Sequence, residues 1–239
     1  MLIFTATTKS NPDAPMQKNF SYSKYYRSCL MTLLVFSSSL MSFSLSAKLD
    51  NQEIEFDIYL NDKKVGQQSV KIMPTDVGEN VVIESQFNIK LLFVNVFSYQ
   101  HTANEVWADS CLHSIDTTTK ENSDTFFVQS SKIENGLAIT GNLGTQDLQG
   151  CVRSFAYWDL QRLDSERLLN GQTAKYVPAK LVANGQEEFL VKDKAITAAR
   201  YTLTAEGSDI NLWYDNNQNW VGLTTLVKGG RTLSYRLRP

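Results

Sequence analysis

Residues 53–73 read EIEFDIYLNDKKVGQQSVKIM, and this stretch decides the fold class. Over its first eight residues hydrophobic side chains alternate with polar ones, a period of two that is typical of a strand with one buried face. The polar run 61–64 then predicts a turn, and residues 65–73 predict a strand that returns along the first. The hydrophobic side chains on the buried face of the first strand are Ile54, Phe56, Ile58 and Leu60.

The same alternation continues along the rest of the chain. Two Asn-Gly dipeptides, at 135–136 and 184–185, each predict a tight hairpin turn, because a type I′ turn needs positive φ at both central positions. Turn residues at 215–218 and 229–230 separate the last strands. The further predicted strands are 83–93, 99–107, 111–119, 125–134, 137–141, 176–183, 186–192, 199–205, 210–214, 220–227 and 231–238.

Residues 158–170 are the exception to this pattern. Leu160, Leu163 and Leu168 recur at roughly helical spacing, and Gly171 is suited to end a helix. No linker or change of composition divides residues 48–239, so residues 47–239 are expected to form a single domain. The predicted fold is mainly β: a curved antiparallel sheet, or open half-barrel, of hairpins with one short helix near 158–170.

Residues 1–46 have the pattern of an export signal, with Met16 a better start than Met1. Lys18, Lys24 and Arg27 precede an apolar run at 30–45, and small residues precede Ala47, where cleavage is expected before or after that alanine. A retained anchor over 29–47 is the alternative, weakened by six serines in its second half. Cleavage predicts a soluble periplasmic protein without a stable membrane anchor.

The composition narrows the classes of function. Hydrophobic residues make up 42% and charged residues 20%, which is enough to build a core. A net charge of −2 argues against a nucleic-acid binder, and no glycine-rich loop suited to a phosphate occurs. We therefore expect no nucleic-acid partner and no cofactor.

Two cysteines, Cys111 and Cys151, follow the export segment, and an even count in an exported chain predicts a disulfide. Free thiols are one alternative. A metal site made by both cysteines with His101 and His113 is another, although Cys-x-His is a poor chelating spacing. The prediction is therefore a disulfide and no metal.

The same two histidines are the only candidate catalytic bases in the chain. Both fall in predicted strands, and no Gly-x-Ser-x-Gly motif places a serine nucleophile. We predict no catalytic residue and leave enzymatic activity open, with its absence favoured. A lipid hydrolase or isomerase would need His101 or His113 to face a cleft beside a carboxylate or a serine.

Apolar and aromatic residues stand out more than polar ones. Residues 91–97 are apolar on both faces, and an aromatic run at 155–158 follows Cys151 closely. One interpretation is that these residues only cover the open ends of a sheet. The other is that they line a cavity for an apolar ligand. On that second interpretation the candidate ligand-binding residues are Leu91, Phe93, Phe97, Trp107, Phe155, Tyr157, Trp158 and Trp213.

Residues 52–65, 90–95, 150–158 and 209–214 resemble an uncharacterised bacterial family, domain of unknown function six-one-three-four, over nearly all of 50–238. The resemblance implies an exported β-rich protein with no assigned reaction. The closing pattern at 212–232 is similar, more remotely, to half-barrel envelope proteins that carry lipoproteins and shelter acyl chains. That second resemblance transfers no ligand residues.

These observations favour a soluble periplasmic protein that binds or carries a hydrophobic or lipid-like ligand. The alternative is a structural or interaction module whose partner is another envelope protein. A deep apolar pocket would favour the carrier, whereas a filled barrel with a flat exposed patch would favour the module.

Overall fold

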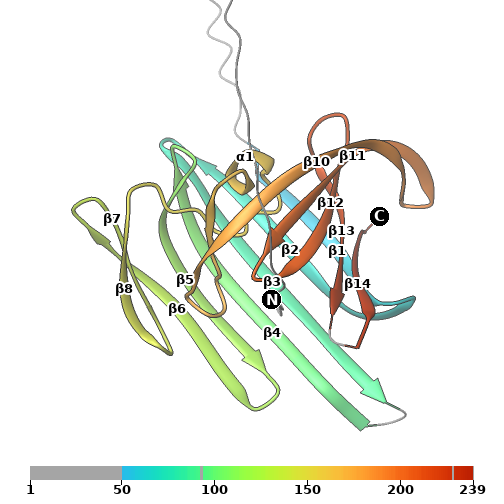
Figure 1. Ribbon diagram of the computed structural model, residues 1–239, viewed down its shortest axis with the longest axis horizontal. Helices are drawn as coiled ribbons and strands as arrows, with labels where there is room; N and C mark the ends of the chain where they lie inside the picture. Colours follow the sequence, from blue (N-terminus) through green and yellow to red (C-terminus); the bar gives the residue numbers. More distant parts are fainter. Residues whose placement is uncertain (1–49, 92–93, 228, 239) are drawn as a thin grey trace, which may run out of the picture. The chain divides into compact units, whose positions relative to one another are not determined.

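The computed structural model describes residues 50–91, 94–227 and 229–238, so the predicted export signal lies outside the described residues. Fourteen strands form one antiparallel sheet that curves around a short helix (Figure 1). The strands are β1 (Gln52–Leu60), β2 (Lys63–Thr75), β3 (Gly78–Leu91), β4 (Val94–Ala108), β5 (Cys111–Glu121), β6 (Asp124–Ile133), β7 (Gly136–Gly141), β8 (Gly144–Gln149), β9 (Arg167–Leu169), β10 (Tyr176–Val191), β11 (Lys194–Ala205), β12 (Ser208–Tyr214), β13 (Trp220–Val227) and β14 (Arg231–Leu237).

The strand order combines two runs of hairpins. One run goes from β8 back to β1 and the other from β14 back to β9, and the two meet where β1 pairs with β14. Strands β8 and β9 end the sheet, and among the described residues they do not pair with each other. The sheet is therefore open, which confirms the predicted open antiparallel architecture.

Strand β1 lies at the centre of this order and has the predicted alternation. Ile54, Phe56, Ile58 and Leu60 are all buried, and Phe56 and Ile58 are fully so. The centroid of the Phe56 ring lies 4.1 Å from that of Trp220 on β13, so the junction of the two runs is part of the main hydrophobic core.

The two Asn-Gly dipeptides have different structures. The first lies in a hairpin, as predicted, but the turn is shifted by one residue: Ile133 pairs with Gly136, so Glu134 and Asn135 are the turn residues and Gly136 already belongs to β7. The second prediction was wrong, since β10 runs straight through residues 184–185. Ala183 pairs with Tyr201 and Gln186 with Ala199, so β10 has one residue more than β11 in this interval. This is a β-bulge, and the positive φ of 90° at Gly185 serves the bulge instead of a turn.

Helix α1 (Leu160–Leu163) is shorter than predicted. Asp159 caps its start by accepting hydrogen bonds from the backbone N–H groups of Gln161 and Arg162. Leu168 and Leu169 belong to β9 instead, because β9 pairs with Tyr176–Pro178 and the Leu169 N–H bonds to the Arg153 carbonyl. Among the residues that the structure describes, no helix has the length and apolar character needed to cross a membrane.

Residues 150–175, here called the crossing segment, run from the β8 edge of the sheet to the β10 edge and contain α1 and β9. On one side the Leu112 N–H bonds to the Val152 carbonyl at 2.8 Å. On the other side the Tyr214 hydroxyl donates to the Tyr157 carbonyl at 2.8 Å. The segment therefore links strands of both runs.

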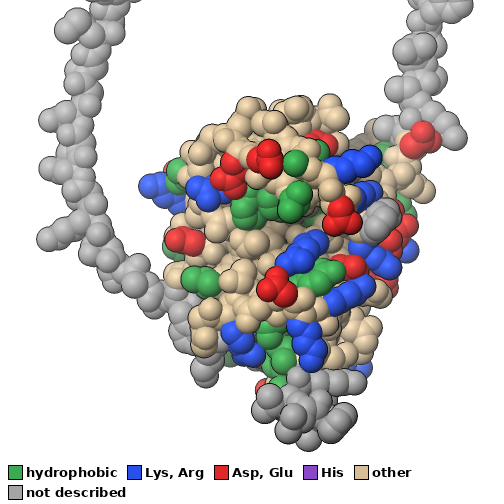
Figure 2. Space-filling model, turned by 90° about the vertical axis from the view of Figure 1, so that its right-hand side faces the viewer, with side chains coloured by type: hydrophobic (Ala, Val, Ile, Leu, Met, Phe, Trp, Pro, Cys, Tyr) green, Lys and Arg blue, Asp and Glu red, His purple; other side chains and the backbone are tan. Residues whose placement is uncertain are grey.

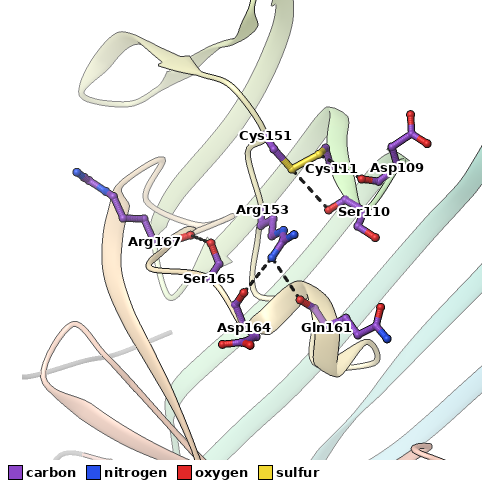
Figure 3. Close-up of a disulfide and its surroundings, with 9 residues drawn as sticks. All are labelled: Asp109, Ser110, Cys111, Cys151, Arg153, Gln161, Asp164, Ser165 and Arg167. Atoms are coloured by element: carbon purple, nitrogen blue, oxygen red, sulfur yellow. Dashed lines mark hydrogen bonds between the residues drawn. A yellow bond between two sulfur atoms is a disulfide. The ribbon is translucent and has the colours of Figure 1, made fainter. Parts of the chain in front are cut away.

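A disulfide fixes the first end of the crossing segment, as predicted. Cys111 at the start of β5 is bonded to Cys151, with a Cα–Cα distance of 5.1 Å (Figure 3). Just beyond, the guanidinium of Arg153 donates to the backbone carbonyls of Gln161 and Asp164, at 3.3 and 2.9 Å. The bridge and this arginine hold the segment in a compact loop next to β5.

The disulfide closes a loop of 40 residues in sequence separation, which corresponds to about 4 kcal/mol in the chain-entropy description. We expect the double variant Cys111→Ser/Cys151→Ser to lose about 2–5 kcal/mol of unfolding free energy, measured by urea unfolding. Under strong reductant the wild type should unfold at nearly the same urea concentration as the variant. Equal stability of the variant and the oxidised wild type would contradict a stabilising role.

Candidate functional site

A cavity of about 540 Å³ lies between the crossing segment and the inner face of the sheet. Its lining comes from β1 to β5, from β12 to β14 and from the crossing segment, and is mainly apolar and aromatic. This volume falls within the range of about 300–1,000 Å³ found for small-molecule sites. The cavity is therefore the candidate functional site.

Aromatic rings from β3 and β4 form one wall. The register pairs Phe87 with Tyr99 and Ile89 with Phe97, so these side chains stand side by side. The ring of Phe87 stacks on those of Tyr99 and Phe97, with centroids 4.7 and 5.7 Å apart. Gly66 on β2 makes room for it, since a Cβ there would lie 2.3 Å from the Phe87 Cβ. The opposite wall is formed by Trp220, Leu223, Leu233 and Tyr235.

The exposure of the lining residues distinguishes a closed end from an open one. At one end Glu105 and Ser154 are only 4% and 3% exposed. At the other end Val96 is 52% exposed, and Arg231 is also exposed. Strand β4 runs from the open end at Val96 to the closed end at Glu105, and the crossing segment covers that closed end.

Four of the predicted ligand-binding residues line the cavity, namely Phe97, Phe155, Tyr157 and Trp158. The last three lie on the crossing segment, where the ring centroid of Tyr157 lies 5.7 Å from that of Trp220. The Leu91 side chain and the whole of Phe93 lie outside what the structure describes.

Two predicted residues lie elsewhere. Trp107 is 1% exposed and packs edge-on against Trp158, behind the cavity lining. Trp213 lies on the other face of the sheet, because its neighbours Leu212 and Tyr214 point into the main core and strand side chains alternate. There it stacks on Phe189 at 4.6 Å, and Phe189 covers Gly222, where a Cβ would come within 2.5 Å of the ring.

Glu105 is a charged cavity residue that the sequence analysis missed. It is a buried carboxylate that accepts hydrogen bonds from the indole N–H of Trp107 at 2.8 Å and from the Ser154 hydroxyl at 3.0 and 3.2 Å. Burial raises the pKa of Glu105 to about 7, although these hydrogen bonds and the charge of Arg162 act in the opposite direction. The sequence did contain a signal for it: Glu105 alternates with His101, Ala103 and Trp107, which assigns its side chain to the inner face of the strand.

His101 also lines the cavity, whereas His113 is exposed on β5. The Nδ1 atom of His101 lies 2.7 Å from the hydroxyl of Thr119, and its Cα is paired with that of Ser85 on β3. Burial lowers the pKa of His101 to about 4, so the ring is neutral at pH 7. A neutral histidine bonded to threonine contributes a polar wall group to the cavity.

The Tyr99 hydroxyl, near the middle of the cavity, donates to the Gln172 side chain at 3.3 Å. Gln172 in turn donates to the Glu121 carboxylate at 2.9 Å. This chain of hydrogen bonds joins β4 and β5 to the crossing segment. Among residues 50–91, 94–227 and 229–238, no group of three His, Cys, Asp or Glu side chains is placed to hold a metal ion.

On the face seen in Figure 2, Lys and Arg side chains are intermixed with Asp and Glu. The described structure contains ion pairs such as Lys64 with Asp57 at 2.8 Å and Arg238 with Glu55 at 3.2 Å. That face therefore carries no separate basic area of the kind that binds nucleic acids.

Comparison with known proteins agrees with this architecture. Residues 56–238 match the family described as "Domain of unknown function (DUF6134)". The chain belongs to this family. The match confirms the resemblance noted in the sequence.

A structural relative supports the fold. This is the crystal structure of a beta-barrel-like protein of domain of unknown function DUF1849 from Brucella abortus, with a TM-score of 0.57 and 10% identity. The alignment covers 78% of this chain and 94% of that one, and at this identity it supports the fold alone. No curated protein matches the chain.

Two buried cavity groups should give the unfolding free energy a measurable pH dependence. Folded Glu105 keeps its proton up to a pKa of about 7, against 4.5 for the ordinary group, so its contribution to stability falls as pH rises through this interval. Folded His101 stays neutral down to a pKa of about 4, against 6.5, so its contribution falls as pH decreases from about 6.5 to about 4.

We therefore expect Glu105→Gln and His101→Asn to change the pH dependence of the unfolding free energy in opposite directions. From pH 4 to pH 7.5 the unfolding free energy of Glu105→Gln should rise by about 3 kcal/mol relative to the wild type. That of His101→Asn should fall by about 3 kcal/mol over the same range. Urea unfolding at pH steps measures both. Parallel profiles for a variant and the wild type would show that the missing group titrates normally.

Proposed function

We propose that this protein is a periplasmic binding protein or carrier for a hydrophobic, lipid-like ligand. The observation that carries the proposal is the cavity of about 540 Å³, closed at Glu105 and open at Val96 and Arg231. Its walls are aromatic and aliphatic side chains held by strand pairing, so the site exists before a ligand arrives. A preformed site needs less ordering when it binds.

The gain from filling such a cavity is large. Transfer of an acyl chain from water into an apolar site contributes about 0.8 kcal/mol for each buried CH₂ group. Ten such groups would contribute on the order of 8 kcal/mol, before the loss of translational and conformational freedom is subtracted. The open end at Val96 gives a chain-like molecule a route into the cavity.

The cavity also weighs against the interaction module. A module of that kind would be expected to have a filled interior and to present a flat apolar patch. The proposed periplasmic location rests on the export pattern of residues 1–46, which fits the disulfide of the folded part.

Two adjacent positions on β13 provide a direct test of binding. Thr225 lines the cavity, whereas Leu226 is 66% exposed on the other face. We expect Thr225→Trp to fill part of the cavity and to weaken uptake of diphenylhexatriene, an uncharged hydrocarbon probe, by about tenfold or more. The rise in probe fluorescence on titration measures the affinity.

Leu226→Trp is the matched control, because it adds the same ring to the same strand on the outside. Its probe affinity should equal that of the wild type. Equal binding by both variants would place the probe outside the cavity, and absence of binding by the folded wild type would contradict the proposed function.

The proposed location has its own test. Full-length protein expressed in a Gram-negative cell should appear in the periplasmic fraction with a new N-terminus at or directly after Ala47. A variant lacking residues 16–46 should stay in the cytoplasm with both thiols reactive. Intact residues 16–46 in a membrane fraction would instead support the retained anchor.

A further inference from the structure

We infer that Glu105 and Ser154 form a polar anchor at the closed end of the cavity, which binds the hydrogen-bond-donating head, an amine or a hydroxyl, of an otherwise apolar ligand. The inference rests on the proposed function and specifies the ligand class. It predicts discrimination against a ligand whose buried end is a carboxylate.

The hydrogen bonds of the polar anchor leave acceptors free. A carboxylate offers about four lone-pair sites on its two oxygens. Among the residues that the structure describes, Glu105 receives two donors from side chains, the Trp107 indole and the Ser154 hydroxyl. Since Ser154 uses its one proton on Glu105, its own oxygen also remains an acceptor. Both residues line the cavity, so a ligand that reaches the closed end meets acceptors and needs to bring donors.

The charges around the polar anchor favour the same ligand. The nearest cation, Arg162, has ionic partners of its own in Glu79 and Asp159, the latter at 3.0 Å. Its guanidinium lies over the Trp107 ring at 4.5 Å, and it is not among the residues that line the cavity.

The described lining itself contains one arginine and no lysine; the arginine is Arg231, at the open end. At pH 8, above the pKa of about 7, Glu105 is ionised. A ligand carboxylate at the closed end would then face a second negative charge without a cation to pair with, and the two like charges repel. An ammonium or hydroxyl group there would complete the hydrogen bonds of Glu105 instead.

Glu105 and Ser154 are not needed merely to hold β4 and the crossing segment together. The segment is already fixed to the sheet at this end by the backbone bond from Leu112 to Val152 and by the disulfide. A buried carboxylate destabilises the fold unless it is fully paired. The polar anchor lacks that full pairing, and both of its residues line the cavity.

Competition against diphenylhexatriene at pH 8 tests the inference with three ligands of equal chain length. We expect decylamine to displace the probe from the wild type best, then decan-1-ol, with decanoate about tenfold or more weaker than the amine. Glu105→Gln should reduce decylamine affinity about tenfold relative to its own affinity for the probe. Glu187→Gln is the matched control, because Glu187 also accepts a tryptophan N–H but lies outside the cavity lining, and it should keep the wild-type order.

A measurement on the wild type alone covers the case in which Glu105→Gln does not fold. The indole N–H of Trp107 donates to Glu105, whereas that of Trp213 donates to Glu187 on the outer face at 2.7 Å. In a ¹H–¹⁵N spectrum decylamine should shift the Trp107 indole signal and leave the Trp213 signal in place.

The outcomes separate this inference from the proposed function. Probe binding with equal affinity for amine and carboxylate, or an unshifted Trp107 signal at saturation, would overturn the polar anchor while leaving the carrier intact. An unchanged amine preference in folded Glu105→Gln would overturn it equally. Failure of the wild type to bind any hydrocarbon would overturn both.

Discussion

The site depends on one constraint: the crossing segment must stay bonded to both runs of strands. The disulfide and the Leu112–Val152 bond fix it to β5, and the Tyr214–Tyr157 bond fixes it to β12. An open sheet has no closing pair of strands to define its curvature. The crossing segment, held at both sides, sets the distance between the two runs of strands. It covers the closed end of the cavity at the same time.

Alternation along strands carried most of the fold from sequence. The alternation from Ile54 to Leu60 defined a buried face, and an alternation with period two can be recognised without knowing which strands pair. The errors arose where local signals compete with pairing. Asn184-Gly185 has the chemistry of a turn, yet the partner strand β11 continues past it and turns the extra residue into a bulge. Leu168 has helical spacing, yet it pairs with Val177 of β10 and therefore belongs to strand β9.

The candidate site was harder to predict, because a cavity depends on which face each strand presents and on what covers it. The aromatic run 155–158 was recognisable from composition and lines the cavity. Trp213 was placed wrongly among the lining by residue type alone, although alternation with Leu212 and Tyr214 assigns it to the outer face. Glu105 was overlooked because a single carboxylate in a strand usually lies in solvent, and only the covering segment makes it buried.

A cavity of this size also affects the stability of the fold. If 540 Å³ were sealed and empty in an apolar core, the lost contacts would destabilise the protein by on the order of 10 kcal/mol, as much as a typical domain's entire stability. An open end at Val96 and a polar closed end at Glu105 reduce this penalty, because water can occupy part of the space. A ligand that replaces that water restores the missing contacts and binds only the folded state. On the proposed function, ligand binding would thereby raise the stability of the fold.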